Sequence, residues 1–203
     1  MSISYPLELP TNIGPRRIAF SAISSVALSR SKFTFATQVQ KHQGMAWLAE
    51  VTLPPMARAD AEEWTAFLLS LNGQEGTFYL RDPLGSVPRG SASGTPLVNG
   101  GSQTGQELVT DGWSTSVDGV LLKGDYIQLG TRLYKVLEDV NSNGSGQATI
   151  SIWPSIRESP ADNDTVITSG ARGVFRLANN ANEIWNADET QIYGASFTAV
   201  EAL

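Results

Sequence analysis

Residues 32–53 read KFTFATQVQKHQGMAWLAEVTL, and this stretch decides which fold the chain can adopt. Apolar side chains alternate with polar ones on both sides of a polar run, Lys41-His42-Gln43-Gly44. Alternation with a period of two places the apolar side chains on one face of a strand. We therefore predict a long β-hairpin over residues 32–53, with its turn at residues 41–44 and one buried face.

One helix is expected after this hairpin. Four apolar residues follow the spacing i, i+3, i+4 and i+7, namely Trp64, Phe67, Leu68 and Leu71. That spacing gives a helix a single apolar face. Asp60 is placed to cap the N-terminus, and Gly73 is placed to end the helix in a left-handed conformation. The sequence thus predicts a helix over residues 58–72.

The other apolar segments are short and separated by Gly, Asn and Asp, as expected for strands and turns. Residues 82–106 are rich in Gly, Ser and Pro, which is typical of a domain boundary. Short, closely spaced strand patterns follow and indicate a small barrel. We predict a mainly β chain with one helix, in which a split β-barrel or sandwich domain (residues 1–84 plus 171–203) carries an inserted small β-barrel (residues 85–170).

The composition excludes several classes of protein. The chain has 203 residues, no cysteine and a formal net charge of −6, so disulfides and thiolate chemistry are absent. Lys and Arg form no long run of the kind that binds nucleic acid by neutralising phosphates. No apolar stretch approaches the ~20 residues of a membrane-spanning helix, and the N-terminus lacks the pattern of an export signal. We expect neither sequence-specific nucleic-acid binding nor membrane insertion.

Candidate catalytic residues are few. His42 is the only histidine, and its neighbours Lys41 and Gln43 place it in the predicted turn. A Ser-His-Asp site needs a serine and an acid that converge on an oriented imidazole, and no motif supplies them. Acidic residues are numerous, but their spacing selects no pair suited to hydrolysing glycosides. We predict that the chain is not an enzyme.

One segment resembles a metal site. The sequence Asp139-Val-Asn141-Ser-Asn143-Gly144 matches the first six positions of a calcium-binding loop. The twelfth position should be a glutamate that binds the ion through both oxygens, but Ile150 occupies it. We interpret the segment as an Asn-Gly turn and predict no metal and no cofactor.

The chain contains five tryptophans, Trp47, Trp64, Trp113, Trp153 and Trp185. Trp47 and Trp64 fall on core-facing positions of the hairpin and the helix. Trp113 lies in a predicted loop, so it is a candidate for stacking against a sugar ring. This gives the alternative hypothesis that the inserted barrel is a carbohydrate- or receptor-binding module.

Several stretches carry a resemblance to a known family. They are AEEWTAFLLSLNG (61–73) running into GTFYLRDPLG (76–85), KGDYI (123–127) with LYKV (133–136), and the C-terminal YGASFTAVEAL (193–203). In these stretches and in the order of its elements, the chain resembles the distal tail proteins of long-tailed bacteriophages and of related gene-transfer particles.

The resemblance implies a structural role in the virion. It implies a homo-hexameric ring at the distal end of the tail, made from subunits synthesised in the host cytoplasm. Such a ring joins the tail tube to the tail hub or tip proteins and lets DNA pass through its lumen. The inserted barrel is then similar to an oligonucleotide-binding fold. We name Lys41, His42 and Gln43, at the predicted hairpin tip, as candidate ring-interface residues.

Overall fold

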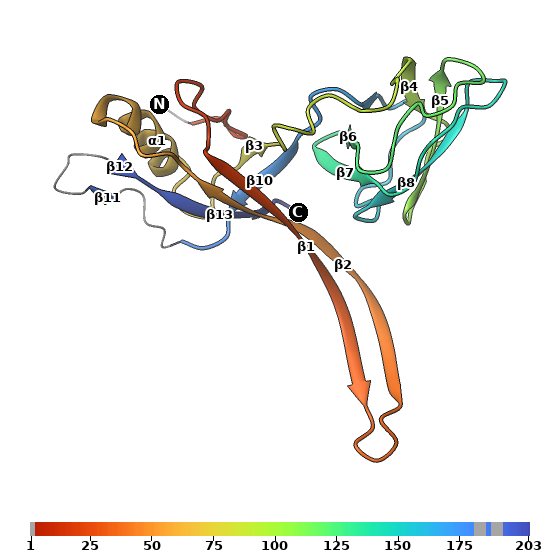
Figure 1. The fold of residues 1–203 in the computed structure, drawn as a ribbon, viewed down its shortest axis with the longest axis horizontal. Coiled ribbons are helices and arrows are strands. Elements are labelled where there is room, and N and C mark those ends of the chain that lie inside the picture. Colours follow the sequence, from red (N-terminus) through yellow and green to blue (C-terminus); the bar gives the residue numbers. More distant parts are fainter. Residues whose placement is uncertain (1–2, 181–185, 188–192) are drawn as a thin grey trace.

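The computed structural model describes residues 3–180, 186–187 and 193–203 (Figure 1). These residues form a mainly β structure with a single helix, α1 (Arg58–Ser70). The strands are β1 (Arg17–Arg30), β2 (Thr37–Thr52), β3 (Phe78–Leu80), β4 (Gly94–Val98), β5 (Glu107–Trp113), β6 (Tyr126–Leu129), β7 (Arg132–Val136), β8 (Ala148–Trp153), β9 (Val166–Ile167), β10 (Gly173–Leu177), β11 (Asn186–Ala187), β12 (Tyr193–Gly194) and β13 (Ser196–Glu201). The predicted fold class is confirmed.

Strands from the two ends of the chain form one sheet. Its order is β1-β2-β13-β10-β3, and all of its strand pairs are antiparallel. Leu7 extends the β3 side through an isolated parallel bridge to Phe78. Two short strands, β11 and β12, pair separately. This five-stranded sheet therefore holds residues near 20 and 200 in one layer, with β2 between them.

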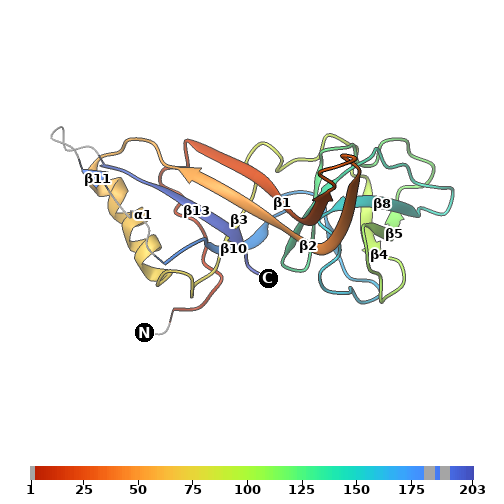
Figure 2. The same cartoon turned by 90° about the horizontal axis from the view of Figure 1, so that it is seen from below.

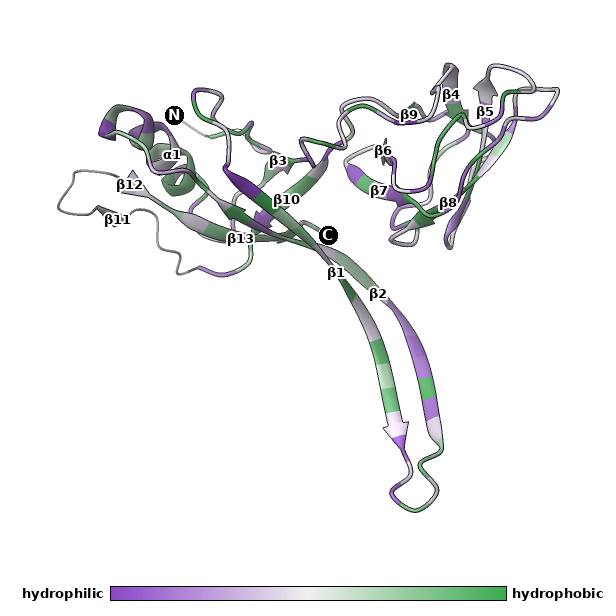
Figure 3. Cartoon of the chain, viewed as in Figure 1, coloured by the Kyte–Doolittle hydropathy of each residue, from purple (hydrophilic) through white to green (hydrophobic). Residues whose placement is uncertain are grey.

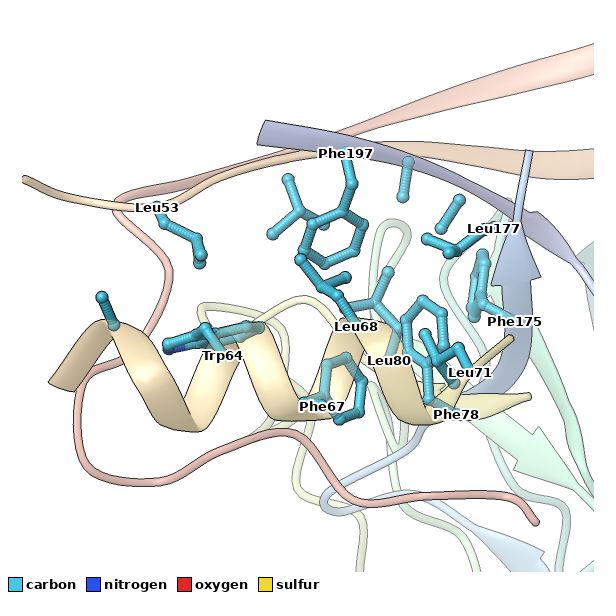
Figure 4. Packing of buried hydrophobic residues seen from close by; sticks show 14 of the residues in the cluster. Leu53, Trp64, Phe67, Leu68, Leu71, Phe78, Leu80, Phe175, Leu177 and Phe197 are labelled. Atoms are coloured by element: carbon cyan, nitrogen blue, oxygen red, sulfur yellow. The ribbon is translucent and has the colours of Figure 1, made fainter. Parts of the chain in front are cut away.

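Helix α1 covers one face of this sheet (Figures 1 and 4). The predicted apolar face of the helix is buried, and its side chains point at the strands; the residues drawn at this contact include Trp64, Leu68, Phe78, Phe175 and Phe197. Aromatic rings meet edge to face, for example Phe67 with Phe78 at 5.6 Å between centroids, an arrangement that adds to the stabilisation from burial.

The ends of the helix differ from the prediction. The residue before the first turn is Ala57, and no side chain caps the N-terminus. Asp60 lies inside the first turn, where its charge still favours the positive end of the helix dipole, so its predicted capping role is wrong. Regular helix ends at Ser70 and Leu71 forms the C-cap, whereas Gly73 follows with a φ of 67°.

The hairpin also differs from the prediction. Strand β1 pairs with β2 from Arg17 opposite Thr52 out to Arg30 opposite Thr37. The turn therefore lies at residues 31–36, and the predicted turn at residues 41–44 is wrong because these residues belong to β2. Long polar side chains suit a strand that is exposed on both faces, so the polarity of that run was not evidence for a turn.

A second sheet forms a nearly closed barrel from residues 94–167. Its order is β4-β5-β8-β7-β6-β9. A bridge between Leu97 and Thr165 connects the first strand to the start of the last, and the Val98 amide donates to the carbonyl of Asp164 at 2.9 Å. The barrel has its own buried cluster, including Leu108, Ile127, Tyr134, Ile150 and Ile152. The predicted boundaries at residues 84 and 170 stay a prediction.

The two sheets meet at Trp47. Its ring lies 4.3 Å from that of Trp153, edge to face, and its indole N–H donates to the carbonyl of Leu133 at 2.9 Å. The backbone N–H of Trp47 donates to Glu201 at 3.3 Å. Burial raises the pKa of the Glu201 carboxyl, and the Trp47 N–H and the charges of Arg157 and Arg132 partly oppose this rise. Trp47 therefore fixes the root of the hairpin between both sheets.

Beyond this root, the hairpin leaves the rest of the molecule. Figure 1 shows β1 and β2 projecting as a long, curved ribbon, and the view in Figure 2 looks along it.

Within the described residues, no helix has the length and apolar character needed to span a membrane.

Candidate interaction surface

His42 lies on the exposed surface of β2, beside an irregularity in the hairpin. The register shifts between Ser24 and Val26, so three residues of β2, His42 to Gly44, stand against Ser25 alone. This is a bulge, which bends a strand pair. Across the described chain, no group of three or more metal-binding side chains comes together. His42 therefore lies in the bulge of β2 and not in a turn.

The calcium-like segment uses its oxygens to build turns. Asp139 Oδ1 accepts from the Lys123 amide at 2.8 Å, and Asn141 Oδ1 accepts from the Gly119 amide at 2.7 Å. Asn143 Oδ1 accepts from the amides of Ser145 and Gln147, both at 2.9 Å. Each of these side chains is therefore directed at the backbone, which fits the interpretation as a turn.

Trp113 is not available for stacking. It lies in β5 with only 4% of its surface exposed, and its indole N–H donates to Thr110 Oγ1 at 2.8 Å inside the barrel. The predicted loop position is wrong, because β5 continues through Gly112, whose φ of 74° shifts the alternation by one residue and turns Trp113 inward with Leu108 and Thr110. The structure also places Trp47 and Trp64 in the core, as predicted. Trp185 lies outside the described residues.

The rest of the fold leaves most of the projecting hairpin uncovered and reaches its base, where Lys41 donates to Gln106 Oε1 at 3.2 Å and Arg157 donates to the Gln43 carbonyl at 3.4 Å. We call residues 25–44 the arm. Nearly every residue of the arm is exposed, yet it carries five large apolar side chains: Val26, Leu28, Phe33, Phe35 and Val39. Figure 3 shows hydrophobic colour on the projecting parts of β1 and β2. Contiguous exposed apolar patches are typical of interaction surfaces, so the arm is the candidate surface of this chain.

Strand register shows how the apolar side chains are arranged. Leu28 stands opposite Val39, and Val26 stands opposite Lys41. Residues directly opposite each other share a face of the pair, so Val26, Leu28 and Val39 form one row. Along β2, an even number of residues separates Val39 from Trp47, so the two side chains lie on the same face of the strand. The arm therefore continues the face that is buried at the root, and Leu28 and Val39 remain 66% and 61% exposed.

The tip of the arm is a defined loop. The Ser31 amide donates to the carbonyl of Ala36 at 2.9 Å, and Ser31 Oγ accepts from the amides of Phe33 and Thr34 at 3.3 Å. Phe35 has a φ of 57° and lies under the Arg30 guanidinium, 4.5 Å from the ring centroid. Positive φ is costly for a bulky residue and is concentrated at functional sites. This loop presents Phe33 with 96% of its surface exposed.

The arm also offers backbone hydrogen bonds. Strand β1 is the outermost strand of its sheet and has 14 residues, none of them proline. An outer strand of this length presents a row of N–H and C=O groups that can pair with another strand. Its charged residues, Arg17 and Arg30, lie only at its two ends. The edge is therefore an open template for a partner.

The sequence contained a weak signal for this surface. Ile18, Phe20 and Ala22 alternate with small residues, and Val26 and Leu28 continue the same spacing. The intervening positions are mostly Ala and Ser, which lowers the contrast between the two faces. Comparison of the sequence with protein-family models and with curated proteins found no match.

Proposed function

We propose that this chain is a structural virion protein, a distal tail protein whose copies form a six-membered ring. In this proposal the ring joins the tail tube to the tail hub or tip proteins, and DNA passes through its lumen. The observation that carries it is the arm, which presents an apolar row and an open strand edge that its own chain does not cover. The resemblance in the helix and C-terminal stretches supports the choice of family.

A ring follows naturally from a projecting arm. When a protruding element of one subunit binds a different surface of the next, the contact is head to tail, and it closes into a ring if the rotation between subunits allows. Burying the arm in this way removes both the exposed apolar row and the free edge. The carbohydrate-binding alternative loses support, because its stacking residue Trp113 is buried.

The test is to find the protein in its assembled form. Six copies of 21.8 kDa correspond to about 131 kDa, so light scattering of the purified protein and electron microscopy of intact particles are both informative. We expect a six-fold ring between the tube and the tip. A monomer on a peripheral fibre, or absence from purified particles, would overturn the proposal.

A further inference from the structure

The charge of the chain is sharply divided. Residues 9–49 contain none of the 20 acidic residues but five of the 14 basic ones, Arg16, Arg17, Arg30, Lys32 and Lys41. The remaining nine basic and 20 acidic residues give the rest of the chain a formal charge of −11. The hairpin itself, residues 17–52, also contains Glu50 and has a formal charge of +3, against −9 for the rest of the chain. This distribution favours association of opposite surfaces.

The cations of the arm have no carboxylate partner of their own. The ion pairs of the described residues lie elsewhere. Lys41 donates to an uncharged acceptor, the amide oxygen of Gln106, at 3.2 Å. Arg30 lies over the Phe35 ring. Lys32 is exposed at the tip. Basic and apolar side chains are therefore presented together along the arm.

A surface of the barrel has the complementary character. Glu107 of β5 stands opposite Ser151 of β8, and the Leu137 amide donates to the carbonyl of Ser151 at 2.8 Å. Register places the three side chains on one outward row, and Val109 follows Glu107 two residues along the same face. Val109 and Leu137 are 39% and 47% exposed, and the exposed Glu138 comes next in the chain. We call this the barrel patch, made of Glu107, Val109, Leu137 and Glu138.

We propose that the arm of one copy docks on the barrel patch of a second copy, with Val26, Leu28 and Val39 against Val109 and Leu137. Lys32 then meets Glu138, and Lys41 exchanges its hydrogen bond to Gln106 of its own barrel for Glu107 of the second copy. This rests on the proposed ring and names the surface that closes it. A second copy fits better than a nucleic acid, since the apolar row has no counterpart on phosphates. Both halves of the contact are present in every subunit.

Charge reversal on each side tests the docking. An arm variant, Lys32→Glu with Lys41→Glu, and a patch variant, Glu107→Lys with Glu138→Lys, each place like charges in contact. We expect each variant alone to weaken self-association at least ~10-fold, measured by sedimentation at low salt with folding checked by circular dichroism. The control, Glu63→Lys with Glu75→Lys, makes the same charge change in and just after α1, outside the barrel, and should leave self-association unchanged.

Mixing the two variants separates contact between copies from closure within one chain. In a 1:1 mixture, each reversed arm meets a reversed patch and each native arm meets a native patch, so alternating subunits can close an even-membered ring. Restored assembly in the mixture supports the proposal. It is overturned if the single variants assemble normally, if the mixture stays dissociated, or if the arm binds anionic vesicles or DNA more tightly than it binds a second copy. If the wild type forms rings and the charge-reversed variants form them equally well, the proposed docking surface is wrong but the ring stands. If particles contain no ring, the proposed function itself is wrong.

Discussion

The root and the arm of the hairpin share two strands and one apolar face, but they differ in what covers that face. At the root, Trp47, Ala49 and Val51 pack under α1 and against the barrel and are almost fully buried. On the arm, Leu28 and Val39 continue the row in solvent. Alternation along a strand therefore predicts which face is apolar. It does not predict whether that face is buried by the same chain or left exposed for a partner.

Replacing Trp47 at the root should have the largest effect on the monomer. Trp47→Ala removes the contact with Trp153 and the hydrogen bond to Leu133, and it opens a cavity where the two sheets meet. We expect the free energy of unfolding to fall by about 3–5 kcal/mol, measured by urea denaturation. An unfolding curve like that of the wild type would show that the root is no better packed than the arm.

Glu201 provides a pH test of the same root. Burial raises its folded-state pKa above the ordinary value of 4.5, so the folded state holds a proton more tightly than the unfolded state does. This contribution to stability is present below the unfolded pKa and is lost as the pH rises through the folded pKa.

The variant Glu201→Gln should lack this loss. Denaturation of both proteins from pH 4 to pH 8 should give a stability difference, wild type minus variant, that decreases with pH and then levels off. A constant difference across this range would show that Glu201 titrates in the folded protein as it does in the unfolded chain.

On the arm, the matched change is Leu28→Ser. Leu28 is exposed and lies in the row that we propose to be an interface, so the monomer should change by no more than about 0.5 kcal/mol. Self-association should nevertheless weaken. The informative measurement is sedimentation beside urea denaturation of the same sample. A loss of monomer stability close to that of Trp47→Ala would mean that the arm folds back on its own chain.

The smallest effect is expected for His42→Ala. The side chain is exposed at the bulge, so removing it should change stability by less than about 0.5 kcal/mol and leave assembly intact. Light scattering and thermal unfolding together check this result. Normal folding with lost assembly would place His42 within the interface.

The sequence predicted the elements whose apolar face packs against other parts of the same chain. The α1 face was recognised because Trp64, Phe67 and Leu68 follow a helical period and pack on strands of the same chain. The fold class followed from strand alternation and from the spacing of turns. These features depend on neighbours within a few residues or on a single buried face, so a period in the sequence is enough to reveal them.

The turn and the interaction surface were not predictable in the same way. The tip at residues 31–36 is closed by Ser31 and a positive φ at Phe35, without the glycine that usually marks such a turn. Trp113 was placed in a loop because Gly112 precedes it, although β5 continues through both residues. Serine-rich β1 showed little contrast between its faces, and only pairing with β2 revealed which side is apolar.

The arm projects from the bulge at His42 to Gly44, so a small change of angle at the bulge moves the tip by a larger distance. From Ser24 to Arg30 the strand extends about 20 Å at ~3.3 Å per residue, so a change of about 10° at the bulge moves the tip by about 3–4 Å. A displacement of that size is enough to separate Phe33 from any pocket that receives it. Trp47 packs against both sheets three residues from the bulge. By holding the hairpin there, it also limits how far the position of the arm tip can vary.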